Sequence, residues 1–98
     1  MSYQDLIDAD QRLVILKVLK ADDDKRLNDR MIQKAAAYVG HDMETAKVRG
    51  HLEFLEVQQL VTLERLPENL WIAQLKDNGL RVAEGRKTVP GVAEPSLG

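Results

Sequence analysis

The sequence predicts a mainly α-helical domain that carries a small β-hairpin, an α+β fold. Three observations support this prediction. Apolar residues recur at helical spacing through most of the N-terminal half, two of the resulting helices are joined by a short turn that contains glycine, and residues 61–75 alternate polar and apolar side chains around a break at Pro67. With 98 residues, the chain has the length of one small domain.

The first predicted helix covers residues 5–20, a stretch without proline or glycine that ends in a lysine suited to the negative end of a helix dipole. Its apolar residues spread around most of the helix, whereas a surface helix has one apolar face. Either this helix is the buried centre of the domain, or its second apolar face contacts another subunit. We favour the second interpretation and expect a homodimer through this helix. The apolar residues are Leu6, Leu13, Ile15, Leu16, Val18 and Leu19.

The second predicted helix covers residues 29–39. Asn28 can cap its free amides, and Leu27 and Ile32 have the spacing of a hydrophobic staple. Gly40 is expected to end it. Its inner side is predicted to consist of Ile32, Ala35, Ala36 and Val39.

The third predicted helix begins at Thr45 with "TAKVRGHLEFLEVQQ", in which Val48, Leu52 and Leu55 share one face. Because only a short glycine-containing turn separates it from the second helix, the pair is a candidate helix-turn-helix.

Two strands are predicted in "VTLERLPENLWIAQL", residues 61–75. An isolated two-stranded ribbon is marginally stable, so it should pack on the helices. Either Trp71, Ala73 and Leu75 or the opposite set, Leu70 and Ile72, would face them. Three helices followed directly by a hairpin is the order of a winged helix-turn-helix, in which the hairpin is the wing.

The wing should be followed by a short fourth helix within "KDNGLRVAEG", with Leu80 and Ala83 facing inward and Gly85 at its end. The Asn-Gly pair could instead have formed a turn before a third strand, an alternative that we reject. The winged-helix domain is thus expected over residues 3–86. Residues 87–98, which contain two prolines and two glycines, are predicted to form an extended or disordered tail.

Three segments carry a family resemblance. The segments "AKVRGHLEFLEVQQLVTL" and "LKDNGLRVAEG" resemble the third helix, wing and fourth helix of ArsR- and MarR-type repressors. The closing segment "GRKTVPGVAEPSLG" is similar to that of small winged-helix proteins from Mu-like phages and prophages. The resemblance implies the fold and a phage origin. Gln59 stands where the repressor pattern has glycine, Lys76 replaces its threonine, and no residues match the metal sites of ArsR-type sensors.

The second helix of a helix-turn-helix motif enters the major groove of DNA, and neighbouring cations contact phosphates. Arg49 could donate two hydrogen bonds to a guanine, and Gly50 would allow close approach. The predicted DNA-contacting residues are Thr45, Lys47, Arg49 and Gly50 on the third helix, Arg30 and Lys34 on the second, and Arg65 on the wing. Against this, Glu44, Glu53 and Glu56 would repel phosphate if they face the duplex, and all of these charges could be a solvated surface.

The composition argues against other functions. The chain has no cysteine and two histidines, and "ADDD" at 21–24 lacks the ligand spacing of a calcium loop, so we expect no metal or cofactor. His51 is expected to pack between helices. No phosphate-binding loop or catalytic triad is found, so we do not expect an enzyme. Neither a membrane span nor a secretory signal is evident, which favours the cytoplasm of the bacterial host.

Two functional hypotheses follow. The first is a homodimeric phage DNA-binding protein that regulates transcription, with double-stranded DNA as its partner. The second is a winged helix that binds another protein during phage assembly and does not bind DNA. The net charge of −2 favours the second hypothesis, whereas Lys47 and Arg49 favour the first.

Overall fold

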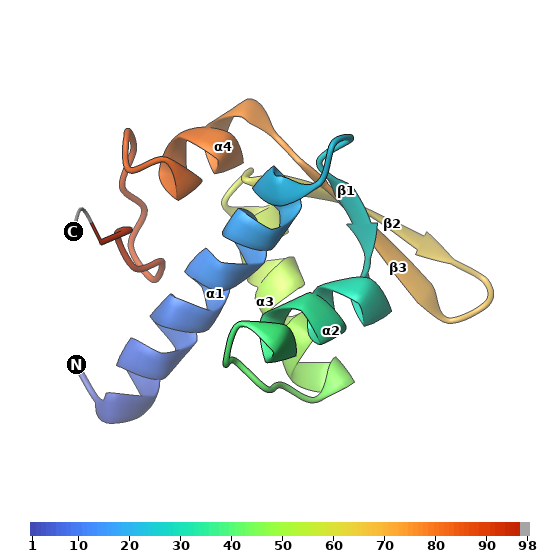
Figure 1. The fold of residues 1–98 in the computed structure, drawn as a ribbon, viewed down its shortest axis with the longest axis horizontal. Coiled ribbons are helices and arrows are strands. Elements are labelled where there is room, and N and C mark those ends of the chain that lie inside the picture. The colour runs from blue at the N-terminus through green and yellow to red at the C-terminus, as the bar shows by residue number, and fades with distance from the viewer. Residues whose placement is uncertain (97–98) are drawn as a thin grey trace.

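The computed structural model describes residues 1–96 and shows helices packed around one end of a small antiparallel sheet (Figure 1). The order of helices and strands is the predicted one, with one additional strand before the second helix. The elements are α1 (Tyr3–Ala21), β1 (Arg26–Asn28), α2 (Asp29–Tyr38), α3 (Thr45–Val57), β2 (Val61–Leu66), β3 (Leu70–Leu75) and α4 (Asp77–Ala83). Among residues 1–96, no helix is both long enough and apolar enough to cross a membrane.

The additional strand is β1, which pairs antiparallel with β3 and gives the strand order β1-β3-β2. Its central residue, Leu27, lies opposite Ala73. A strand of three residues shows too little alternation to be predicted from sequence. Its conformation comes from pairing with β3, which lies more than forty positions away in the chain. The pairing begins where the Lys25 carbonyl accepts the N–H of Leu75 at 2.9 Å.

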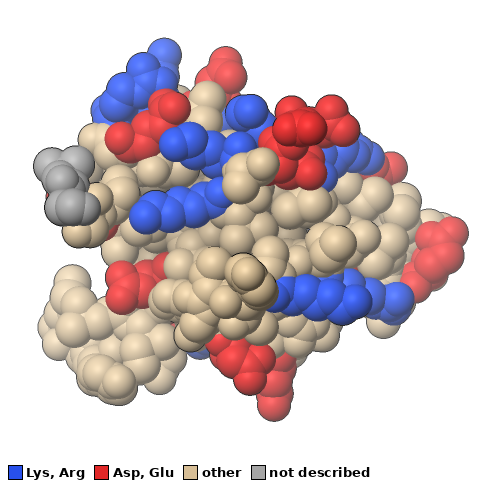
Figure 2. Space-filling view, viewed as in Figure 1, with Lys and Arg blue, Asp and Glu red and all other residues tan. Residues whose placement is uncertain are grey.

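Helix α1 is the centre of the domain and contacts α2, α3, α4 and β3. Its start is fixed by a capping box, in which the Asp5 amide donates to the Ser2 hydroxyl and the Ser2 amide donates to the Asp5 carboxylate. The buried-centre interpretation accounts for Leu13, Ile15, Leu16 and Leu19. Val14 and Val18 remain partly exposed, and uncharged surface interrupted by basic side chains lies on the face that α1 and α2 share (Figure 2).

The wing uses the first of the two predicted faces. Ala73 and Leu75 are buried and Trp71 is half-buried against the core. Helix α4 packs so closely behind the wing that a side chain at Gly79 would place its Cβ 2.2 Å from the Leu60 carbonyl oxygen. This contact explains why glycine stands there. Within α4, Val82 and Ala83 are buried while Leu80 is half-buried, so the predicted inner face was correct for Ala83 and incomplete without Val82.

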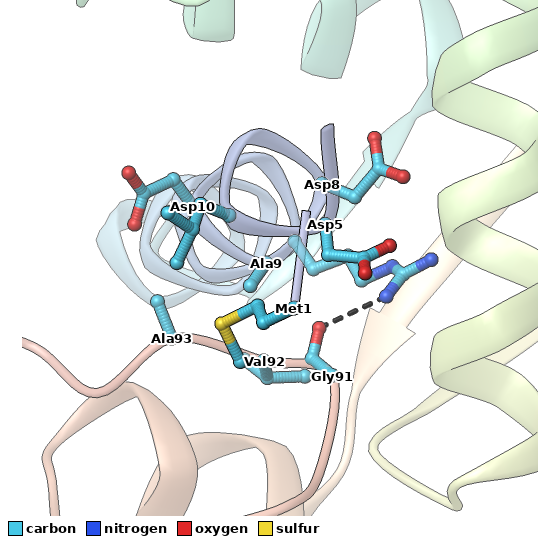
Figure 3. Close-up of a pocket in the computed structure, with 10 residues that line it drawn as sticks. Met1, Asp5, Asp8, Ala9, Asp10, Gly91, Val92 and Ala93 are labelled. Atoms are coloured by element: carbon cyan, nitrogen blue, oxygen red, sulfur yellow. Dashed lines mark hydrogen bonds between the residues drawn. The ribbon is translucent and has the colours of Figure 1, made fainter. Parts of the chain in front are cut away.

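The segment after α4 contains no helix or strand as far as residue 96, and it packs back on α1 (Figure 3). Val92 is buried in the core, the Ala93 amide donates to the Ala9 carbonyl at 3.1 Å, and Arg12 donates to the Gly91 carbonyl at 3.0 Å. Gly91 has a positive φ of 89°, and a Cβ there would lie 2.6 Å from the Phe54 ring. The predicted tail is therefore attached to the domain over its described part; its last residues, 97–98, lie outside the described chain.

Candidate nucleic-acid interface

The outward face of α3 is formed by small side chains in its N-terminal half and by Glu53 and Val57 further along. Ala46 and Gly50 are exposed, and a Cβ added at Gly50 would meet no atom within 4 Å. The residue before the helix, Glu44, occupies the N-cap position and makes no side-chain hydrogen bond to the helix. The first turns of α3 thus present a low, uncharged surface that the floor of a DNA groove could approach closely.

Thr45 holds the turn between α2 and α3 rather than pointing freely outward. Its hydroxyl donates to the Gln33 side-chain oxygen at 3.1 Å, and the Gln33 amide donates to the Met43 carbonyl at 2.8 Å. These two hydrogen bonds fix the relative position of the two helices. They also show that the flank of α2 that carries Gln33 faces the start of α3.

Arg49 lies at the centre of a set of contacts that we call the Arg49 cluster. Its Nε donates to the Asp29 carboxylate at 2.6 Å, its two Nη atoms donate to the Asn69 side-chain oxygen at 2.8 Å and carbonyl at 2.6 Å, and its guanidinium stacks 4.9 Å from the centre of the Trp71 ring. The Asp29 side chain is completely buried, and its second oxygen accepts the Trp71 amide at 3.3 Å. This cluster ties α3 to α2 and to the wing turn.

The Arg49 cluster bears on the prediction that Arg49 reads a guanine, which remains a prediction. Three of its five N–H donors, one from each nitrogen, are used within the chain, so a contact of two hydrogen bonds with a base would compete with Asn69 or Asp29. Releasing Asp29 would leave a buried carboxylate without its cation, which is costly. The geometry therefore makes Arg49 a positioning residue for α3.

Lys47 is also paired inside the chain. Its Nζ lies 2.8 Å from the Asp8 carboxylate of α1. The hydrogen bond from Lys47 holds the pKa of Asp8 below its usual value. Lys47 therefore faces α1, on the side of α3 away from the wing.

Arg65 on β2 pairs with two carboxylates of α3, which together form the Arg65 cluster. It lies 3.1 Å from Glu56 and 3.7 Å from Glu53, and it stacks 4.5 Å from the Trp71 ring centre. The bond to Glu56 raises the pKa of Arg65. All three charged side chains are substantially exposed. Two of the acidic residues expected to oppose DNA binding are thus partly neutralised by the wing.

Arg30 and Lys34 are exposed and form no ion pair with any residue in the described range 1–96. At about 100° per residue, Arg30 lies about 60° around α2 from Gln33, on the flank that faces the start of α3. Lys34 lies about 100° from Gln33 and points outward between that flank and Tyr38. Of the predicted DNA contacts, these two are the cations that remain available to phosphate.

Sequence reasoning did not find Asp29, Asn69 or Gln33, which hold the predicted contacts in place. Asp29 is an ordinary acidic residue in the first turn of α2. Its pairing with Arg49 joins residues 20 positions apart, so no local pattern indicates it. The positive φ of Asn69, 62°, is a turn feature typical of asparagine and could have drawn attention to that residue.

His51 packs between α3 and α1, as predicted, with 3% of its surface exposed. Its Nδ1 accepts from Arg12 Nε at 3.1 Å, so the proton of the neutral ring lies on Nε2, 2.8 Å from the Gln11 oxygen. Burial lowers the pKa of His51 to about 4, with further contributions from Arg12 and Lys47. Within residues 1–96, no group of three or more His, Asp or Glu side chains is arranged to hold a metal ion.

Both departures from the repressor pattern occur at one place. Gln59 has a positive φ of 64°, a backbone conformation that favours the glycine of the pattern. Its side-chain oxygen accepts a hydrogen bond from Lys76 Nζ at 3.4 Å. Lys76, which replaces the threonine of the pattern, thus contacts Gln59, which replaces its glycine.

The helix order, the three-stranded sheet and the wing define the chain as a winged-helix protein. A solved structure reported as the complex structure of hsRosR-S4 has the same fold, with a TM-score of 0.62 and 19% sequence identity. The similarity covers 74% of this chain and 62% of that one. No family model matches the sequence.

Two relatives are close enough to assign a family. The chain is 38% identical over 91 residues to Uncharacterized protein gp26 of Escherichia phage Mu, which covers 93% of each chain. It is 37% identical over 95 residues to an uncharacterized protein of Haemophilus influenzae, which covers 92% of each. The chain therefore belongs to the family of phage Mu gp26, in agreement with the resemblance of its closing segment.

Proposed function

We propose that this protein is a non-enzymatic, double-stranded DNA-binding regulator of a Mu-like phage, active as a homodimer in the cytoplasm of the host. The observation that supports DNA binding best is the low, uncharged outer surface of α3 at Ala46 and Gly50, with Arg30 and Lys34 exposed on the neighbouring helix α2. A helix with this surface fits the major groove closely, while the two cations reach the phosphates beside it.

In this proposal Arg49 and Arg65 act through position. The Arg49 cluster holds α3 and the wing turn at a fixed angle, and the Arg65 cluster holds the wing strand on α3. Few donors on α3 remain free for base edges, so phosphate contacts and groove shape should supply most of the affinity. We expect strong salt dependence and modest selectivity among sequences.

The proposal is tested by measuring binding to labelled fragments of the phage genome at about 50 and 200 mM salt. A Gly50→Glu variant should lose binding because it adds bulk and negative charge where the groove floor would lie. A Gly50→Ala variant should keep most of it. Since a Cβ at Gly50 meets no neighbour and glycine is a poor helix former, neither change should destabilise the fold.

A second pair of variants tests the phosphate contacts. Arg30→Ala with Lys34→Ala should weaken binding and reduce the slope of affinity against salt by about 1 for each lost contact. The matched control is the double variant Arg81→Ala with Lys87→Ala. It removes the same number of positive charges from exposed positions, one on α4 and one in the segment after it. Helix α4 packs on a different side of α1 from α2 (Figure 1). Equal losses in both double variants would contradict the proposed surface.

One observation favours a second candidate, a winged helix that binds a phage protein and not DNA. Glu44 and Glu53 are exposed on α3, whereas Lys47, Arg49 and Arg65 are engaged with carboxylates. An absence of DNA binding even at low salt would contradict the first candidate and leave this one.

A further inference from the structure

A continuous apolar depression, the α1–α2 groove, lies between the outer side of α1 and one flank of α2. It consists of two adjoining hollows of about 330 and 450 Å³. Val18, Ala21 and Val39 line both hollows, and Figure 2 shows uncharged surface between basic side chains on the face where these two helices lie. Met31 and Tyr38 stand at its edge with 49% and 91% of their surfaces exposed. Contiguous apolar surface of this kind marks interaction sites.

The groove lies on the opposite flank of α2 from the proposed DNA surface. Gln33 bonds to Thr45 and thus marks the flank that faces α3. At about 100° per residue, Met31 and Tyr38 project to the other side of the helix, toward α1. A partner seated in the groove would leave Arg30 uncovered, whereas Lys34 lies only about 40° around the helix from Tyr38. Val39, which the sequence placed on the inner side of the second helix, is 56% exposed and belongs to this groove.

We infer that the α1–α2 groove is the surface on which a second copy of this chain docks, about a two-fold axis. The inference rests on the homodimer of the proposed function and identifies its interface, but it does not depend on DNA binding. It extends the predicted contact of the first helix to α2, because both helices contribute the walls.

The charges of the groove are self-complementary. Lys17 lines one of the two hollows and Asp22 lines the other. They lie on either side of the residues that both hollows share, which are Val18, Ala21 and Val39. A two-fold axis through the shared residues places Lys17 opposite the partner's Asp22, and each ion pair then occurs twice. Surfaces that meet about a two-fold axis must be self-complementary, which this arrangement satisfies.

The shape agrees with the same symmetry. The Met31 and Tyr38 side chains project beside the hollows, so each copy offers both a protrusion and a recess. Ala21 and Ala35 at the groove are small enough for the helix backbones to approach. A central apolar contact with charged groups at its rim is the usual composition of a protein interface.

The experiment is sedimentation velocity of the full chain without DNA, over a range of concentrations. Val39→Asp places an unpaired charge in the groove and should weaken the dimer roughly tenfold or more. Val57→Asp is the matched control, because Val57 is 77% exposed at the end of α3, outside the groove. Lys17→Glu, at an exposed position, should also weaken the dimer without affecting the fold.

A cross-linking test gives a second readout. The chain has no cysteine, so an Ala21→Cys variant carries a single thiol within the groove. A short bifunctional maleimide should join two copies of this variant and not two copies of Val57→Cys.

The outcomes separate the inferences. A dimer that Val39→Asp and Lys17→Glu leave intact would overturn the groove as the interface while preserving the homodimer. A monomer at all concentrations would overturn both. Either result leaves the DNA-binding experiment to be decided by its own variants.

Discussion

Two arginines stack on the same Trp71 ring, yet their surroundings differ. Arg49 lies 4.9 Å and Arg65 4.5 Å from the ring centre. The Arg49 side chain is 19% exposed and pairs with a carboxylate that is completely buried. Arg65 is 42% exposed and pairs with Glu53 and Glu56, which are exposed themselves.

The difference shows that residue type does not determine the role of a cation in a helix-turn-helix domain. A buried ion pair contributes little net stability compared with apolar packing, but removal of one partner leaves an uncompensated charge. An exposed pair can be lost at small cost, because water solvates both groups. The Arg49 cluster is thus part of the fold, whereas the Arg65 cluster is a surface contact whose loss should cost little stability.

The largest expected effect is on the free energy of unfolding. Arg49→Ala should lower it by about 3 kcal/mol, because the Asp29 carboxylate stays buried without its cation. Arg65→Ala should lower it by less than about 1 kcal/mol. Urea titrations at one fixed protein concentration measure both values, since self-association would change apparent stability with concentration.

An Asp29→Asn variant serves as a control for this comparison. It keeps a side chain that can accept from Arg49 and removes the buried negative charge, so it should cost less than Arg49→Ala. Equal losses for Arg49→Ala and Arg65→Ala would show that the two clusters do not differ in the way their burial indicates.

The hydrogen-bonded pair of His51 and Arg12 adds a third case to this comparison, because the charge of His51 changes with pH. The pKa of His51 is lowered to about 4 in the fold from its usual value of 6.5, so the unfolded chain takes up a proton at higher pH than the folded chain does. The free energy of unfolding therefore has its full value above about pH 6.5. It decreases by about 3 kcal/mol in total as the pH falls toward 4.

The measurement is the free energy of unfolding of the protein and of a His51→Gln variant between pH 4 and pH 7. The variant should depend on pH less steeply over this range, since carboxylates common to both proteins cancel in the difference. Parallel curves for the two proteins would contradict the role assigned to His51.

The smallest expected effect concerns salt. Raising the salt to 1 M should reduce the stability difference between the protein and Arg65→Ala by a few tenths of a kcal/mol, because exposed pairs are screened. The corresponding difference for Arg49→Ala should change less, because the Asp29 side chain is shielded from solvent. Urea titrations of the three proteins at low and high salt provide the measurement. A larger salt effect on Arg49 than on Arg65 would reverse the comparison.

The candidate site was only partly predictable. Gly50, Arg30 and Lys34 lie exposed, where a DNA contact would require them. Lys47 and Arg65 were predicted as DNA contacts because they are cations near the motif. Helical periodicity does not reveal that Lys47 pairs with Asp8 or that Arg65 pairs with Glu56. Each of these pairs joins different elements, so it depends on how those elements dock.

The sequence by itself determined the elements and their order, because helical spacing, caps at Asn28 and Gly40, and alternation around Pro67 are local properties. It also indicated the family through its closing segment. Only the tertiary structure decided that β1 pairs with β3, that Arg49 is held by Asp29, and that an apolar groove remains between α1 and α2. Such features depend on contacts between residues far apart in the chain, and local patterns carry no information about those distances.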